Sequence, residues 1–113
     1  MIKLLIIILF FNIVSFSDLY FFSKEIRNNI NYTISWDYFS IPYSLLTGKG
    51  DCYNMAKLYN FGLNIRGISN EIIIIKGDKA NHAIVKVNDS EYGCYMVDVT
   101  NRKFDECVGG DKI

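Results

Sequence analysis

The stretch Gly48-Lys49-Gly50-Asp51-Cys52, near the middle of this 113-residue chain, places a tight glycine turn directly before a predicted helix. Asp51 is a suitable N-cap because its carboxylate accepts hydrogen bonds from the free N–H groups at a helix start. From Cys52 onward, apolar residues recur at helical spacing as far as Gly62 or Asn64, which predicts a helix with one buried face. The pattern therefore places a cysteine at a helix N-terminus, where the helix dipole and unpaired N–H groups stabilise a thiolate.

Three segments after this helix are predicted as strands separated by polar turns. The first, 71–76, contains four consecutive isoleucines, and such a continuous β-branched run predicts a strand buried on both faces. The second, 81–87, and the third, 93–99, alternate in the manner of strands, and the polar residues after Thr100 are expected to form a short tail. A central helix packed on a small antiparallel sheet of three strands is an α+β arrangement.

Two segments before the glycine turn carry weaker signals. Residues 18–31 are predicted as a short helix because apolar side chains recur at three- and four-residue spacing. Residues 30–39 mix β-branched and aromatic side chains without clean alternation and are expected to be irregular. Pro42, the only proline of the chain, is expected to keep its surroundings non-helical.

The first residues of the chain resemble a leader. One lysine precedes an apolar run of about a dozen residues, and small residues at Ser15 and Ser17 suit signal-peptide cleavage. We therefore expect 1–17 to be a signal peptide and 18–113 to be a single minimal domain, exported to the periplasm or the extracellular space. The alternatives are an uncleaved N-terminal membrane anchor over 4–22, about 19 residues long and just sufficient to span a bilayer, or a helix buried in the core.

Three cysteines are an odd number for an exported chain, so one thiol is expected to stay free or to pair between chains. Cys52 is the candidate free thiol. Cys94 and Cys107 could form a disulfide in an oxidising compartment, or Cys94 could be a small buried residue without a partner. We expect the unpaired alternative, because nothing in the sequence fixes the distance between the two Cα atoms.

Composition excludes several classes of partner. The chain carries 12 basic and 12 acidic side chains, with no long run of either sign, which argues against a nucleic-acid partner. Neither Cys-x-x-Cys nor His-x-x-x-His occurs, so a metal site is disfavoured and no cofactor is expected. The expected partner is a protein or peptide substrate, with membrane contact only if the leader is uncleaved, and the oligomeric state is left open.

The only histidine, His82, and Asp98 fall in consecutive predicted strands, where they can be cross-strand neighbours. Together with Cys52 they are the parts of a thiol-based acyl-transfer site. In such a site Cys52 attacks a carbonyl or carboxamide carbon, His82 holds the proton and returns it to the leaving amine, and Asp98 fixes the imidazole tautomer. The alternative is that each residue is structural, since an isolated cysteine at a helix start is most often a buried apolar residue.

A tetrahedral intermediate also needs hydrogen-bond donors for its oxyanion. The backbone N–H of Cys52 is one expected donor, because helix N-termini leave such groups free. A second donor is expected from the segment before the glycines, where Trp36, Tyr38 and Tyr43 are the candidates.

These residues resemble the transglutaminase-like superfamily over about Tyr32 to Thr100. The matching motifs are a Gly-x-Cys at a helix start, a Gly-Ile pair after that helix, a strand that opens with histidine, and a strand that ends in Asp-x-Thr: Gly50-Asp51-Cys52, Gly67-Ile68, His82-Ala83-Ile84-Val85 and Val97-Asp98-Val99-Thr100. The stretch from Trp36 to Cys52 is similar to the bacterial transglutaminase-like cysteine peptidase branch, although Tyr53-Asn54 replaces an acidic residue that some members of that branch carry.

The resemblance implies the papain-like α+β core of cysteine proteinases, with Cys52, His82 and Asp98 as the active residues. It implies an enzyme: a cysteine peptidase or amidase, or an amide transferase, acting on peptide or carboxamide bonds through a thioester. Hydrolysis is expected, because cross-linking needs a site that holds an amine and keeps water out. The alternatives are a catalytically silent binding module of the same fold and a cell-wall peptide amidase.

Overall fold

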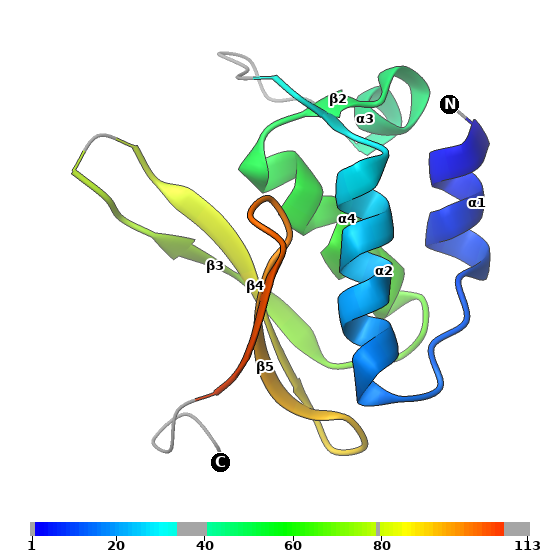
Figure 1. Ribbon diagram of the computed structural model, residues 1–113, viewed down its shortest axis with the longest axis vertical. Coiled ribbons are helices and arrows are strands. Elements are labelled where there is room, and N and C mark those ends of the chain that lie inside the picture. The colour runs from blue at the N-terminus through cyan, green and yellow to red at the C-terminus, as the bar shows by residue number, and fades with distance from the viewer. Residues whose placement is uncertain (1, 34–40, 79, 108–113) are drawn as a thin grey trace.

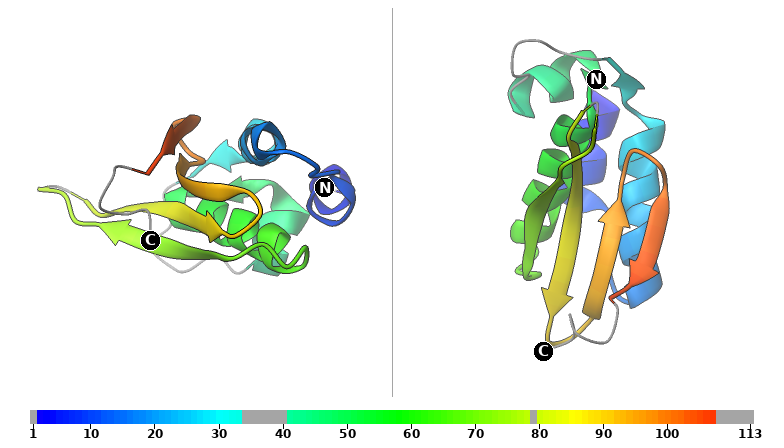
Figure 2. Two further views of the ribbon diagram at one scale, coloured as in Figure 1. Left: turned by 90° about the horizontal axis from the view of Figure 1, so that it is seen from below. Right: turned by 90° about the vertical axis from the view of Figure 1, so that its left-hand side faces the viewer.

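The computed structural model of the protein describes residues 2–33, 41–78 and 80–107 (Figure 1). In chain order the elements are α1 (Ile2–Phe10), α2 (Phe16–Asn28), β1 (Asn31–Tyr32), α3 (Ile41–Thr47), β2 (Lys49–Gly50), α4 (Cys52–Asn64), β3 (Asn70–Ile75), β4 (His82–Asp89), β5 (Gly93–Asp98) and β6 (Lys103–Glu106). Strands β3, β4, β5 and β6 form an antiparallel sheet in that order, and β1 pairs with β2 in a separate parallel pair. The helices form a layer on one side of the sheet (Figure 2), which is the predicted α+β class.

Helix α4 is the element that the sequence predicts best. It begins at Cys52, and its cap is reciprocal: Asp51 Oδ1 accepts from the Asn54 N–H at 3.1 Å, while the Asp51 N–H donates to Asn54 Oδ1 at 2.9 Å. Gly50 allows this close approach, since a Cβ at that position would lie 2.7 Å from the Cβ of Asn54. The buried face of α4, which includes the fully buried Leu58 and Tyr59, packs against β3 and β4.

The two N-terminal helices pack beside α4. Helix α2 begins at Phe16, two residues before its predicted start. Helix α1 contributes Leu4 and Ile8 to the core, and the guanidinium of Arg66, just beyond α4, donates to the carbonyl of Ile8 at 2.7 Å. The stretch 4–22 is therefore divided between two helices, and no helix in the described ranges is long and apolar enough to cross a membrane.

Two predictions about the sheet are wrong. Strand β3 is an edge strand that α4 covers on one face only, and its end extends beyond the helices (Figure 1). Ile74 and Ile75 are therefore 46% and 48% exposed, and the isoleucine run is not buried on both faces. Of the residues after Thr100, which were predicted as a tail, Lys103–Glu106 form a fourth strand, β6, and 108–113 lie outside the described residues. Phe104 accounts for that strand, because it pairs with Val97 in register and its ring stacks on a tyrosine of β5 at 4.7 Å.

The region around Pro42 also differs from its prediction. Helix α3, Ile41–Thr47, contains Pro42 as its second residue. A proline is tolerated in the first helical turn, where no intrahelical partner is lost. Of the segment predicted as irregular, 31–32 form β1, and 34–40 lie outside the described residues.

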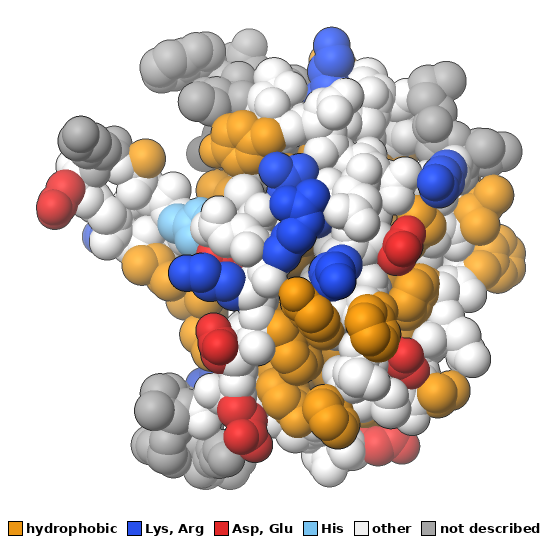
Figure 3. All heavy atoms as spheres, viewed as in Figure 1, with side chains coloured by type: hydrophobic (Ala, Val, Ile, Leu, Met, Phe, Trp, Pro, Cys, Tyr) orange, Lys and Arg blue, Asp and Glu red, His pale blue; other side chains and the backbone are white. Residues whose placement is uncertain are grey.

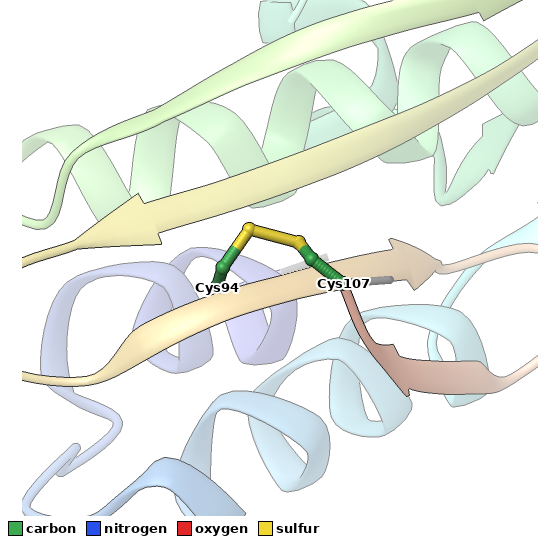
Figure 4. The surroundings of a disulfide bond; sticks show 2 residues. All are labelled: Cys94 and Cys107. Carbon is green, nitrogen blue, oxygen red and sulfur yellow. A yellow bond between two sulfur atoms is a disulfide. The ribbon is translucent and has the colours of Figure 1, made fainter. Parts of the chain in front are cut away.

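A disulfide joins Cys94 to Cys107, with the sulfur atoms 2.00 Å and the Cα atoms 5.4 Å apart (Figure 4). The expectation that these cysteines stay unpaired is therefore wrong. The pairing of β5 with β6, extended by a hydrogen bond from the Cys107 N–H to the Cys94 carbonyl at 3.1 Å, brings the two residues opposite one another. Cys52 is free, as predicted.

Candidate active site

The imidazole of His82 and the carboxylate of Asp98 form a close polar pair in the candidate site. Nε2 of His82 lies 2.8 Å from Oδ2 of Asp98, which confirms that the two residues are neighbours on adjacent strands. Val85 pairs with Val97, and extending this register by one residue places Asp98 opposite Ile84, diagonal to His82. Strand alternation thus puts both side chains on one face of the sheet.

Asn101 holds the Asp98 carboxylate from its other side. Oδ1 accepts from the Asn101 backbone N–H at 3.1 Å, and Oδ2 accepts from the Asn101 side-chain amide at 2.9 Å. Because an ionised carboxylate only accepts, the proton in the contact with His82 is on Nε2, and Nδ1 is the nitrogen left for proton exchange. Sequence reasoning missed Asn101, although an aspartate that ends a strand often bonds the backbone of the turn that follows it.

Cys52 and His82 lie on the walls of one solvent-accessible cavity of about 300 Å³. The residues that line it come from the start of α4, the edge strand and the start of β4: Asp51, Cys52, Tyr53, Ile74, Asn81, His82 and Ala83. Figure 3 shows the single imidazole at the surface beside the β3–β4 hairpin, and 31% of its side chain is exposed. Cys52 is half-buried, and within the described part of the chain no hydrogen bond joins its sulfur to the imidazole.

The sheet face on which His82 lies is also informative. Ala83 and Val85, which alternate with His82 along β4, belong to the core beneath α4, so His82 and Asp98 occupy the opposite face. His82 is the first residue of β4 and lies at the margin of the sheet. At this margin the cavity reaches both the imidazole and the start of α4.

A residue that the sequence did not predict also lies beside the segment leading into α4. Tyr32 lies on β1, opposite Gly50 in the parallel pair that leads into Cys52. Partial burial raises the pKa of Tyr32, and the nearby Cys52 and Asp51 raise it further, against the opposite influence of Arg27. The phenol therefore keeps its proton at neutral pH and is an O–H donor. No sequence signal predicts this pairing of two-residue strands.

The structure tests the oxyanion donors predicted from the sequence only in part. Tyr43 lies in α3, and Trp36 and Tyr38 fall outside the described residues. The Cys52 N–H, at the first position of α4, has no acceptor among the described residues. Within those residues, no three His, Cys, Asp or Glu side chains are grouped as metal ligands would be.

Comparisons with known proteins agree with this architecture. No family model matches the chain, and no curated protein matches it. A solved structure described as "Crystal structure of a TGase", that is, a transglutaminase, superimposes with a TM-score of 0.63 at 15% sequence identity. The match covers 78% of this chain and 27% of that one. The chain thus has the fold of that transglutaminase structure, with α4 packed on a four-stranded antiparallel sheet, and it spans about a quarter of that protein's length.

Proposed function

We propose that the protein is a thiol hydrolase that cleaves peptide or carboxamide bonds through Cys52, His82 and Asp98. The observation that carries the proposal is the 2.8 Å contact between His82 and Asp98 beside a cavity that also contains a cysteine at a helix N-terminus. The transglutaminase-like fold supports it, because thiol-dependent acyl transfer is the chemistry that the sequence motifs imply.

In the proposed reaction, Nδ1 of His82 takes the proton of the Cys52 thiol while Asp98 accepts from Nε2. The thiolate attacks the carbonyl carbon, and the negative charge that develops on the carbonyl oxygen is stabilised by the N–H of Cys52 and the phenol of Tyr32. The C–N bond then breaks, and the imidazolium protonates the leaving amine. Water, deprotonated by His82, hydrolyses the thioester and regenerates the thiol.

Hydrolysis is favoured over amide transfer by the openness of the cavity. Two residues on its walls, Tyr53 and Ile74, are 37% and 46% exposed, so water reaches the position of the thioester. An amine acceptor competes with water only where the site excludes solvent. The expected product is therefore a free carboxylate.

We also propose that the protein is exported, with 1–17 as a cleaved leader. The proposal rests on the apolar run and the small residues that follow it. Cleavage after Ser17 would remove α1, and with it Leu4 and Ile8, from the core of the full chain. N-terminal sequencing of the protein recovered from its host tests it, and an intact Met1 would contradict cleavage.

A catalytically silent binding module is the second candidate. It is favoured by the location of His82 and Asp98 on the sheet face opposite α4, and by the absence, among described residues, of a hydrogen bond between Cys52 and His82. In that case the cavity would bind a peptide without cleaving it.

The test is turnover of blocked peptides by the full chain, compared with Cys52→Ala. We expect Cys52→Ala to abolish turnover and to leave the circular dichroism spectrum unchanged. Lys57→Arg on the same helix, which keeps a cation over the Tyr53 ring, is the matched control. Unchanged activity in Cys52→Ala would refute the proposal. Release of peptides from purified cell-wall material, in preference to protein hydrolysis, would identify a wall amidase.

A further inference from the structure

Strand β3 offers an open edge beside the candidate active site. It is the first strand in the sheet order, and no described strand pairs with its outer side. Figure 1 shows that the β3–β4 hairpin extends beyond the helices. An unpaired edge with exposed isoleucines is a template for pairing with another extended chain.

The register shows which backbone groups face outward. The Asn88 N–H donates to the Ser69 carbonyl at 3.0 Å, next to the pair formed by Asn70 and Val87. Because hydrogen-bonded and non-bonded pairs alternate in antiparallel strands, the odd-numbered residues of β3 bond to β4. The N–H and C=O groups of Ile72 and Ile74 therefore point away from the sheet.

Ile74 connects this edge to the candidate thiol site. Its side chain lines the cavity that contains Cys52 and His82, and Tyr53 provides a second apolar wall. Ile74 pairs with Ala83, directly after His82, so its outward-facing backbone lies level with the imidazole along the sheet. A chain paired with β3 at this position would pass along the cavity.

We propose that the substrate is an extended polypeptide segment that adds to the outer edge of β3, with an apolar side chain against Ile74 and Tyr53 and an adjacent peptide bond at Cys52. This inference rests on the proposed function and names its substrate class. Alternating outward N–H and C=O groups are matched only by an extended peptide backbone, which supplies both at the same spacing. Small amides lack that repeat.

A second copy of the chain is the competing occupant. Strand β3 is six residues long, and only alternate residues offer outward-facing groups. A stable dimer buries on the order of 1,200 Å² or more, which so short an edge does not supply alone. A substrate needs only transient binding, so the short edge suits a peptide better.

The test measures backbone protection in a chain that cannot turn over. The full chain carrying Cys52→Ala is mixed with a doubly blocked nine-residue peptide of alternating valine and threonine with a central glutamine. Amide hydrogen exchange is followed by NMR, and we expect the peptide to slow exchange at Ile72 and Ile74 about tenfold or more, the equivalent of one hydrogen bond. Ile73 and Ile75, already bonded to β4, should change little.

Three outcomes would overturn the inference: no binding, binding without protection of Ile72 and Ile74, or protection that rises with protein concentration when no peptide is present. The last would identify a second copy as the occupant. Ile74→Pro removes the outward N–H and should weaken peptide binding about tenfold, whereas Ile74→Val keeps the N–H and is the matched variant.

Failure of the proposed function gives a different pattern. If Cys52 alkylation in the wild-type chain does not depend on His82, but the peptide still protects Ile72 and Ile74, the catalytic assignment fails and the docking edge stands. If alkylation depends on His82 and no peptide protects these amides, the edge proposal fails and the thiol site stands.

Discussion

The two halves of the candidate site are held in place by different means. On the sheet, the Asp98 carboxylate is within hydrogen-bond distance of three nitrogens, one from His82 and two from Asn101. On the helix side, no comparable set of described side-chain contacts fixes Cys52, whose place is determined by the capping box of Asp51 and the close packing at Gly50.

This difference predicts which substitutions change turnover alone and which also change folding stability. The sheet half depends on side-chain contacts at the surface, so changes there should alter turnover more than folding. The helix half depends on backbone conformation, so changes there should alter both. The following predictions use that contrast, from the largest expected effect to the smallest.

Asp98→Asn should have the largest effect among the following variants, lowering kcat/KM about a thousandfold or more. An amide carries no charge to stabilise the imidazolium, and it offers a single acceptor oxygen to the three nitrogens around Asp98. The measurement is steady-state peptide turnover. Asp105→Asn, an exposed carboxylate on neighbouring β6, is the matched control. A loss of less than tenfold in Asp98→Asn would mean that the sheet half does not take part in the chemistry.

Replacing Cys94 and Cys107 by serine should lower the free energy of unfolding by about 3 kcal/mol, since the disulfide closes a short loop. The two cysteines are separated by 13 positions in sequence. Urea unfolding with and without the disulfide measures the effect. Equal unfolding midpoints would show that hydrogen bonding between β5 and β6 is sufficient without the bridge.

Asp51→Ala should cost about 1 kcal/mol of stability through loss of the N-cap. It should also slow alkylation of Cys52, because the first turn of α4 loses its cap. Asp51→Asn keeps an acceptor for the Asn54 N–H and is the matched variant. Equal alkylation rates in the two variants would contradict the prediction that the N-cap controls the reactivity of Cys52.

Lowering the pH should have the smallest effect. The expected change is a loss of folding stability through Asp89, a carboxylate that belongs to neither half of the candidate site. A hydrogen bond from the Ser69 N–H, joined by those of Glu91 and Tyr92, lowers the pKa of Asp89. The folded state therefore binds this proton less readily than the unfolded state, so the stabilisation is present above the unfolded pKa and is lost as pH falls through the folded value.

Urea midpoints between neutral pH and about pH 3 measure this loss. Asp89→Asn should remove part of the pH dependence without changing peptide turnover. An identical pH profile in wild type and variant would show that other carboxylates control acid stability.

Short sequence patterns correctly predicted the features that are determined by residues close together in the chain or by strand alternation. The start of α4 followed from the glycine turn and Asp51, and the contact between His82 and Asp98 followed from strand alternation. Each signal lies within a few residues of the element that it specifies.

What could not be predicted depends on contacts between distant segments. The burial of β3 depends on which strand lies at the sheet edge, and isoleucine composition carries no information about that. The pairing that places Tyr32 beside Gly50, and the disulfide of Cys94 with Cys107, depend on tertiary register. Pro42 was misinterpreted for a local reason, because a proline ends helices in their interior but is compatible with their first turn.

The measurement that tests the central claim most directly is the pH dependence of Cys52 alkylation by iodoacetamide, in the full chain and in His82→Ala. An ordinary thiol titrates at about 8.5, and the other two cysteines are protected as a disulfide. We predict rapid alkylation well below that pH in the wild-type chain and its loss in His82→Ala. The same ordinary thiol profile in both proteins would contradict a working pair of Cys52 and His82.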